Sequence, residues 1–347
     1  MHVPDGFIDA PTSAVTGVVA AGALAVSLRG ARRELDERTA PLAGLVAAFI
    51  FAVQMLNFPV AAGTSGHLLG GALAAILVGP FTGVLCVSVV LLMQGILFAD
   101  GGLTALGVNI TDMAIVTTVV SYAVFRGLVK VLPRRRRSVT VASFAAALVS
   151  VPAAAVAFTL IYAVGGTTDV ALPKVATAMI GVHVLIGIGE AAITALTVGA
   201  VIAVRPDLVY GARGLEQKLK LRVNGQLVDA PAAEPAVPVA AARSHRKLWL
   251  TGMVSSLILA GFVSFYASAN PDGLEKVAHD KGIDKKAERH ASSDSPLAGY
   301  GVKDIADARF SGGLAGVIGV GVTVVVGSTV FWVVARRRRT SEPVEAA

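Results

Sequence analysis

Long apolar stretches separated by short polar segments run along most of this chain of 347 residues. A helix needs about 20 apolar residues to cross a bilayer, and stretches near that length recur through the first two thirds of the sequence. They predict seven membrane-spanning helices, at residues 12–28, 41–58, a short stretch that ends near 78, 81–98, 110–131, 139–164 and 175–204. The segment before the third stretch ends, NFPVAAGTSGHLLGG, is rich in glycine, proline and small polar residues, and it predicts irregular backbone surrounded by protein.

The last third of the chain differs in composition from the rest. Residues 206–247 are first charged and then rich in alanine and proline, which is typical of a semi-extended linker. Two further apolar stretches, 248–266 and 313–335, predict a helical hairpin with a polar connection. The predicted organisation is therefore a seven-helix domain, a linker, a two-helix hairpin with an external loop domain, and a basic tail, at residues 1–205, 206–247, 248–335 and 336–347.

Composition and charge favour an all-α polytopic membrane protein. Hydrophobic residues make up 54% of the chain and charged residues only 15%, against roughly 25% in a soluble domain. The net charge of +7 includes the clusters RGARRELDER, PRRRR and RRRR at the ends of apolar stretches, where basic residues fix topology. With these clusters inside, the N-terminus lies outside, the C-terminus lies inside, and no nucleic-acid partner is expected.

The first residues, MHVPDGFIDAP, predict a metal chelate. The amine of Met1 and the backbone nitrogen of His2 would close a five-membered ring around a metal, and that nitrogen and Nδ1 of the His2 ring would close a six-membered one. Three nitrogens in one plane suit Ni²⁺, Cu²⁺ or Co²⁺, whereas Zn²⁺ prefers a tetrahedron. Asp5 and Asp9 stand where a signal peptide would carry basic residues, so no signal peptide is expected. A bulky second residue such as His2 generally protects the first methionine from removal, so we expect Met1 to be retained. The turn sequence PDG is expected to fold the amine back into the protein.

His67 is the candidate for a fourth nitrogen. It lies in GTSGHLLGG at the outer mouth of the third span, and polar side chains within membrane segments are candidate functional residues. The alternative is a helix cap, in which Thr64 or Ser65 begins the third helix and His67 bonds only to backbone. Four polar residues near the outer ends of the spans are candidates to orient the ligands, with ordinary interhelical hydrogen bonds as the alternative: Asn57, Ser65, Gln94 and Asn109.

Two other hypotheses involve different residues. His183 and Glu190 share one face of the seventh span, and they favour either a packing role or a proton relay in a proton-coupled secondary transporter of divalent metals. A membrane-embedded metalloenzyme ranks last, because no carboxylate is conveniently placed as a general base. Asp100 and Asp112 are expected mainly to end or cap the neighbouring helices, and the single cysteine, Cys86, excludes a cysteine-based metal cage.

Several motifs that occur in order resemble the CbiM/NikM family, the substrate-capture (S) components of energy-coupling factor (ECF) transporters for cobalt and nickel. They are MHVPDGFID, NFPVAAGTSGHLLGG, GPFTGV, QGILFADGGLTALGVNITDMAIV and HVLIGIGEAAIT, within residues 1–205. The NPDGLE sequence at 270–275 resembles the small CbiN/NikN-type component, here fused. The resemblance implies a seven-helix S-component fold. It also implies that Ni²⁺ or Co²⁺ is held by the Met1 amine, the His2 backbone and ring nitrogens, and the His67 ring.

The resemblance also implies partners. These are a transmembrane coupling subunit of the CbiQ/NikQ type and ATPase subunits of the CbiO/NikO type, in the plasma membrane of a prokaryote. The sequence contains no GxxxxGK[ST] motif, so ATP hydrolysis is expected in those partners. The chain itself is expected to capture and translocate metal without being an enzyme and without a resident cofactor. The fusion slightly favours nickel over cobalt.

Overall fold

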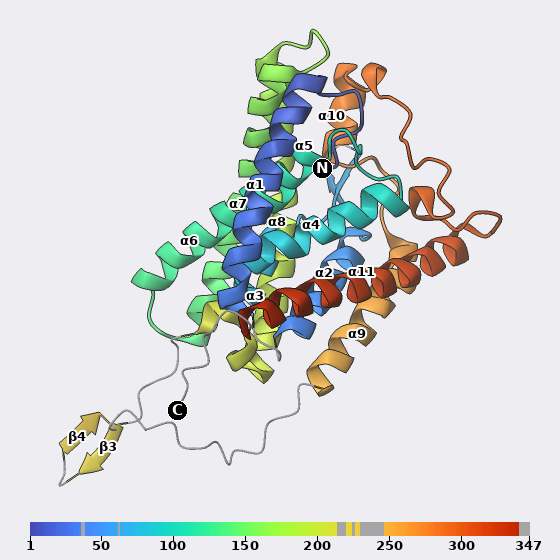
Figure 1. Ribbon diagram of the computed structural model, residues 1–347. Coiled ribbons are helices and arrows are strands. Elements are labelled where there is room, and N and C mark those ends of the chain that lie inside the picture. The colour runs from blue at the N-terminus through green and yellow to red at the C-terminus, as the bar shows by residue number, and fades with distance from the viewer. Residues whose placement is uncertain (36–38, 62, 214–219, 224–225, 230–245, 340–347) are drawn as a thin grey trace.

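Long helices build almost the whole structure, as the apolar stretches predict (Figure 1). The computed structural model describes residues 1–35, 39–61, 63–213, 220–223, 226–229 and 246–339. The first part of the chain forms α1 (Ala10–Glu34), α2 (Ala40–Gln54), α3 (Gly71–Val78), α4 (Pro80–Leu97), α5 (Leu106–Asn109), the π-helical η1 (Ile110–Val116), α6 (Thr117–Val131), α7 (Arg136–Gly165) and α8 (Leu172–Val204). The C-terminal part forms α9 (Arg246–Gly261), α10 (Gly273–Lys281) and α11 (Ala308–Arg339).

The strands of the described part form two antiparallel hairpins. β1 (Phe58–Ala61) pairs with β2 (Thr64–Gly66), just before His67. β3 (Lys220–Val223) pairs with β4 (Gln226–Asp229) inside the region expected to be a linker. The rest of that region at 214–219, 224–225 and 230–245, and residues 340–347 of the expected tail, lie outside the described residues.

Seven helical segments of the described chain are long and apolar enough to cross a membrane, and two of them, α9 with its extension and α11, belong to the C-terminal hairpin. Of the seven spans expected in residues 1–205, the second and third are shorter than a full crossing. α2 has 15 residues, and α3 has eight, which at 1.5 Å per residue span about 12 Å of a hydrocarbon core about 30 Å thick. α3 is flanked by Gly70 and Gly79, with φ of +92° and +104°. Few residues other than glycine adopt these angles, which explains why glycine stands at both ends of the helix.

The C-terminal hairpin is an integral part of the helix bundle. α11 packs along α2, and α9 packs against both of them. Small residues allow this close approach: a Cβ atom at Gly44 would lie 2.2 Å from Ser328 Oγ, and one at Gly316 would lie 2.4 Å from the Ala260 carbonyl oxygen. Such packing of small residues is typical of helices that associate within a bilayer.

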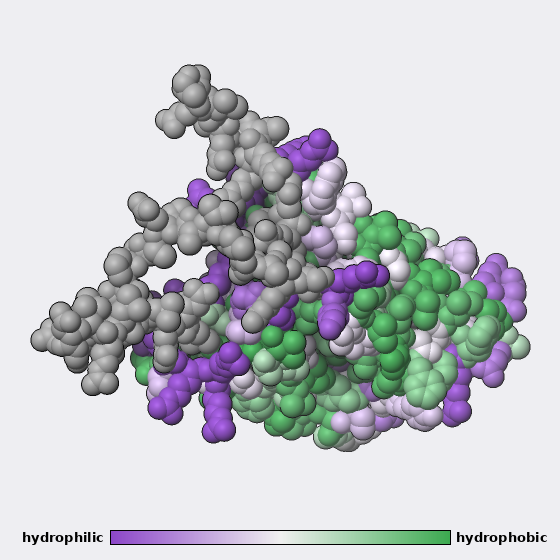
Figure 2. Space-filling view, turned by 90° about the horizontal axis from the view of Figure 1, so that it is seen from below, coloured by the Kyte–Doolittle hydropathy of each residue, from purple (hydrophilic) through white to green (hydrophobic). Residues whose placement is uncertain are grey.

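Apolar side chains also cover the outside of the helices. Val18 of α1, Leu160 of α7 and Leu196 of α8 are 73, 63 and 74% exposed. Figure 2 shows a broad apolar surface with hydrophilic residues gathered mostly along its edges. Because large exposed apolar areas mark membrane contact, and because seven helices are long enough to span, the chain is a multi-pass membrane protein.

The irregular segments of the two parts meet at one end of the bundle, where the N-terminus lies beside α10 (Figure 1). Backbone hydrogen bonds join them. The amide of Ser268 donates to the Asn57 carbonyl at 2.7 Å, and that of Glu288 donates to the Asp5 carbonyl at 2.9 Å. The connection between α9 and α11 therefore covers the N-terminal segment and the β1–β2 hairpin.

Candidate metal centre

The N-terminal segment folds back into the protein. Gly6, with φ of +86°, completes the turn that the PDG sequence predicts. Asn109 then clamps Val3 from both sides: its Oδ1 accepts the Val3 amide at 2.7 Å, and its Nδ2 donates to the Val3 carbonyl at 3.1 Å. Gly102 donates a further backbone hydrogen bond to the same carbonyl at 2.8 Å. As a result Met1 is buried, with 3% of its surface exposed.

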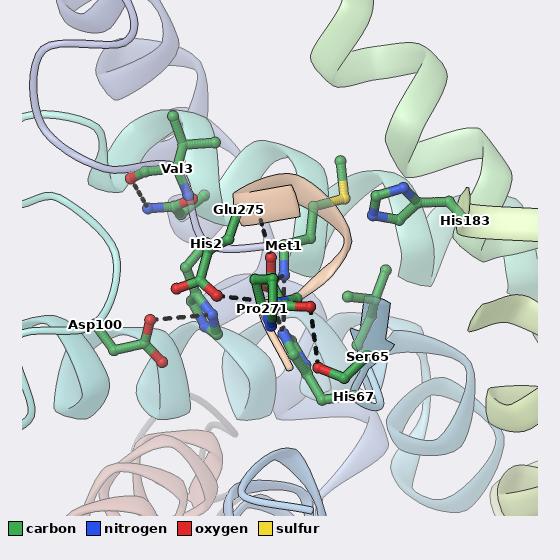
Figure 3. Close-up of polar contacts among 12 residues, drawn as sticks. Met1, His2, Val3, Ser65, His67, Asp100, His183, Pro271 and Glu275 are labelled. Atoms are coloured by element: carbon green, nitrogen blue, oxygen red, sulfur yellow. Dashed lines mark hydrogen bonds and ion pairs between the residues drawn. The ribbon is translucent and has the colours of Figure 1, made fainter. Parts of the chain in front are cut away.

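The terminal amine lies at the centre of a buried polar cluster (Figure 3). Its nitrogen is 2.8 Å from Nε2 of His67 and 2.6 Å from Oδ2 of Asp272. The rings of His2 and His67 stack, with their centroids 5.1 Å apart and their planes 21° from parallel. Two segments separated by 66 residues therefore bring the amine and both imidazoles to one point.

Each imidazole has polar neighbours at its ring nitrogens. Nδ1 of His67 faces the carbonyl oxygen of Leu68 at 3.0 Å, so it donates there and leaves the Nε2 lone pair toward the amine. Nε2 of His2 lies 3.1 Å from Oε1 of Gln94, and its Nδ1 lies 3.3 Å from Oδ1 of Asp100, so both of its ring nitrogens face oxygen atoms. Burial lowers the pKa of His2 to about 4, against the opposing attraction of Asp100, so its ring is neutral near pH 7.

Asp272 comes from the NPDGLE sequence and caps the start of α10. Its Oδ1 accepts the amide of Glu275 at 2.8 Å, while Glu275 accepts the Asp272 amide at 2.9 Å, which is a capping box. Its Oδ2 remains for the terminal amine. Burial alone would raise the pKa of Asp272, but the terminal ammonium and His67 outweigh it and hold that pKa well below its usual range. The carboxylate is therefore ionised.

The residues expected to surround the ligands fall into two groups. Gln94 and Asn109 contact the N-terminal segment directly, as described above. Ser65 instead holds the C-terminal hairpin: its amide donates to the Pro271 carbonyl at 2.9 Å, and its hydroxyl donates to the Asn270 carbonyl at 2.7 Å. Asn57 borders the pocket beside the cluster, and its side-chain oxygen has no hydrogen-bond partner among the described residues.

The helix-cap alternative for this region is wrong. Thr64 and Ser65 belong to strand β2, and Gly70 caps α3. Glu190, buried in α8, accepts the amides of Leu69 at 2.7 Å and Gly70 at 3.1 Å, so it fixes the backbone that follows His67. Nδ1 of His183 donates to the Met179 carbonyl at 2.7 Å, and the ring faces the Met1 side chain (Figure 3).

Asp100 and Asp272 are the site residues that sequence reasoning missed or set aside. Asp100 was expected mainly to end a helix, but its Oδ1 lies 3.3 Å from His2 Nδ1, and its Oδ2 accepts the Tyr300 hydroxyl at 2.6 Å. The D-x-x-E pattern of NPDGLE predicts a capped helix at Asp272, but nothing in the pattern links this residue to the N-terminus. Both residues border a pocket of about 520 Å³ that also reaches His2 and His67.

Together these groups can hold a metal ion. One ligand atom from each of His2, His67 and Asp272 lies within 4.8 Å of the others, and all three residues are buried. The terminal amine adds a further nitrogen. A nitrogen-rich set without a cysteine is suited to Ni²⁺, Cu²⁺ or Co²⁺.

The comparison with known families decides the identity. Residues 2–208 match the CbiM family, the cobalt uptake substrate-specific transmembrane region. The chain belongs to this family. Residues 246–336 match the PDGLE domain, so this CbiM-family protein carries a fused PDGLE hairpin. CbiM proteins are transport proteins, and the chain is accordingly not an enzyme.

Named relatives of this CbiM-family chain transport nickel or cobalt. It is 44% identical over 125 residues to the fused nickel transport protein NikMN of Rhodobacter capsulatus, which covers 36% of each chain. It is 33% identical over 218 residues to the cobalt transport protein CbiM of Geobacter sulfurreducens, covering 60% of this chain and 61% of that one. The crystal structure of a transition metal transporter matches with a TM-score of 0.53 and 28% identity, over 59% of this chain and 93% of that one.

Proposed function

We propose that this chain captures Ni²⁺ or Co²⁺ outside the cell and passes it across the membrane as the substrate-binding component of an ECF-type transporter. The observation that carries the proposal is the convergence of the Met1 amine, His2 and His67 in one buried cluster. Membership of the CbiM family and the nickel and cobalt relatives support the same substrate class.

The proposed ligand set is the Met1 amine, the backbone nitrogen and Nδ1 of His2, and Nε2 of His67. The first three close a five-membered and a six-membered chelate ring, and His67 supplies the fourth corner. Metal binding requires the amine to lose its extra proton and the His2 amide to lose its hydrogen, so two protons leave as one divalent ion arrives. Four nitrogens in a plane suit both Ni²⁺ and Co²⁺.

The partners and the orientation belong to the same proposal. The chain lacks a P-loop, so a CbiQ/NikQ-like coupling subunit and CbiO/NikO-like ATPases would supply the energy. The basic residues at 134–137 and 336–339 favour the cytoplasmic side, so the metal centre would lie at the outer face. Metal would then enter the centre from outside and leave inward when the partner complex reorients the chain.

The proton-coupled alternative receives less support from the geometry. Glu190 is engaged by two backbone amides, and His183 is engaged by the Met179 carbonyl. Both side chains therefore form hydrogen bonds to the backbone, and Glu190 stabilises the segment that carries His67. Uptake that persists without any ATPase partner would favour the alternative.

A binding experiment on the purified full chain with an authentic Met1 tests the proposal. Competition titrations with Ni²⁺ and Co²⁺ are compared for the wild type, His67→Ala and the control His279→Ala. His279 is 78% exposed on α10, so its loss should leave affinity unchanged. Removing His67 should cost more than the roughly 10- to 100-fold that an orienting residue costs. If His67→Ala binds either ion as the wild type does, the proposed centre is wrong.

A further inference from the structure

Asp272 divides its carboxylate between two tasks. One oxygen caps α10 through the amide of Glu275. The other lies 2.6 Å from the Met1 nitrogen and 3.5 Å from Nε2 of His67, although Asp272 stands 271 residues from Met1 in the chain. Its side chain is only 10% exposed. A side-chain carboxylate from the C-terminal hairpin therefore reaches the nitrogens that the proposed function assigns to the metal.

The contact between Asp272 and the terminal amine compensates positive charge in the buried cluster. A buried charge is costly unless an opposite charge accompanies it. Before metal binds, the terminal ammonium carries +1 and Asp272 carries −1. When a divalent ion binds, the ammonium proton and the His2 amide proton leave, so the ion and the amidate together carry +1. Among the amine, the ion, the amidate and Asp272, the charges sum to zero in both states, and without Asp272 the same groups would carry +1.

The neighbouring carboxylates are engaged differently. Asp100 accepts a hydrogen bond from Tyr300, and its side chain is 27% exposed, so solvent screens its charge more. Glu275 is the other half of the capping box and accepts the Asp272 amide. Asp272 is the carboxylate that lies within 4 Å of both the terminal amine and His67.

The turn that contains Asp272 packs closely against residues of the first part of the chain. Ser65 binds the carbonyls of Asn270 and Pro271. The next residue after Asp272 is Gly273, where a Cβ atom would lie 2.8 Å from the Ile186 side chain and 3.2 Å from the His183 ring. The position of the carboxylate is thus set by strand β2 and helix α8, which also hold the metal-binding segments.

We propose that Asp272 is the anionic partner of the metal centre, pairing with the terminal ammonium before metal binds and with the bound cation afterwards. This inference rests on the proposed function and extends it to the C-terminal hairpin. The hairpin would contribute directly to metal affinity through a charge, in addition to covering the centre.

The test compares Ni²⁺ and Co²⁺ affinities of the full chain with an authentic Met1. Asp272→Asn removes the charge but keeps Oδ1 and a good helix cap, and Asp272→Ser removes the charge and replaces the capping oxygen with a hydroxyl, which is also a good helix cap. Asp280→Asn is the matched control, because Asp280 lies on the same helix, is 44% exposed and pairs with Lys276. Asp272→Glu restores the charge. Thermal unfolding without metal establishes that each variant is folded.

Loss of the charge at 272 should weaken binding by about 10- to 100-fold, as for other residues that support metal ligands. Asp280→Asn should bind as the wild type does, and Asp272→Glu should retain more affinity than Asp272→Asn. If the Asn and Ser variants bind as tightly as the wild type, or more tightly, the inference is overturned, because Asp272 would then only cap α10 or compete for the amine. If the wild type itself binds neither ion, the proposed function fails instead.

Discussion

The two segments that meet at the terminal amine are held in different ways. The N-terminal segment is fixed along its length: Val3 is clamped by Asn109, and Asp9 accepts the Thr12 amide at 2.8 Å and caps α1. The NPDGLE turn reaches the same point from the other end of the chain and is fixed mainly by Ser65 and by its own capping box.

The two segments therefore contribute to the metal centre in different ways. The N-terminal segment supplies nitrogens whose relative positions are set by covalent bonds and by a rigid clamp, so any change there alters the chelate itself. The turn supplies one charge through a long-range contact. We therefore expect changes in the first segment to abolish binding and changes around the turn to reduce it by degrees.

One residue added before Met1 should produce the largest effect. The added residue converts the Met1 amine into an amide and displaces the new amine from the buried cluster, so the proposed ligand set with His67 cannot form and binding of Ni²⁺ and Co²⁺ at this centre should be lost. The measurement is a competition titration of the purified chain, with one residue added at the C-terminus as the control. Normal binding by the extended chain would show that the amine is not a ligand.

Asn109→Ala should have the next largest effect. The substitution removes both side-chain hydrogen bonds to Val3, at 2.7 and 3.1 Å, and so loosens the segment that carries the chelate. We expect affinity for Ni²⁺ to fall by about 10- to 100-fold.

Asn57→Ala is the matched control for that experiment. Asn57 borders the same pocket, but its side-chain oxygen has no partner among the described residues, so its removal should leave affinity nearly unchanged. Equal losses in the two variants would indicate that the clamp on Val3 has no special role.

Ser65→Ala should have the smallest effect. It removes the hydroxyl bonds to Asn270 and Pro271 but keeps the backbone bond from residue 65 to the Pro271 carbonyl. We expect a decrease in the free energy of unfolding of about 1 kcal/mol and a smaller loss of metal affinity than in Asn109→Ala. A larger loss of affinity than in Asn109→Ala would reverse the order of importance of the two segments.

Much of the helical architecture could be predicted from the sequence, because a membrane helix is specified by local composition. The glycines around NFPVAAGTSGHLLGG predicted a short third helix with an irregular approach, and the structure has one. The turn that buries Met1 was also predictable, since its PDG sequence is local. The full crossing expected of α2 was not found, because helix ends depend on neighbouring glycines and turns as well as on hydropathy.

The contacts that join distant parts of the chain could not be predicted in the same way. Asp272, Ser65 and Glu190 each act on a segment more than a hundred residues away. Sequence periodicity places Glu190 on a helix face, but it does not show which backbone that face meets. For the same reason Asp272 was predictable as a helix cap and not as the partner of an amine.

X-ray absorption at the nickel edge of the Ni²⁺-loaded full chain, with an authentic Met1, would identify the ligands of the bound ion. The proposed ligand set predicts a near-planar first shell of nitrogen ligands that includes scattering from two imidazole rings, and this spectrum should disappear when one residue precedes Met1. A six-coordinate, oxygen-rich shell, or an identical spectrum from the extended chain, would contradict it.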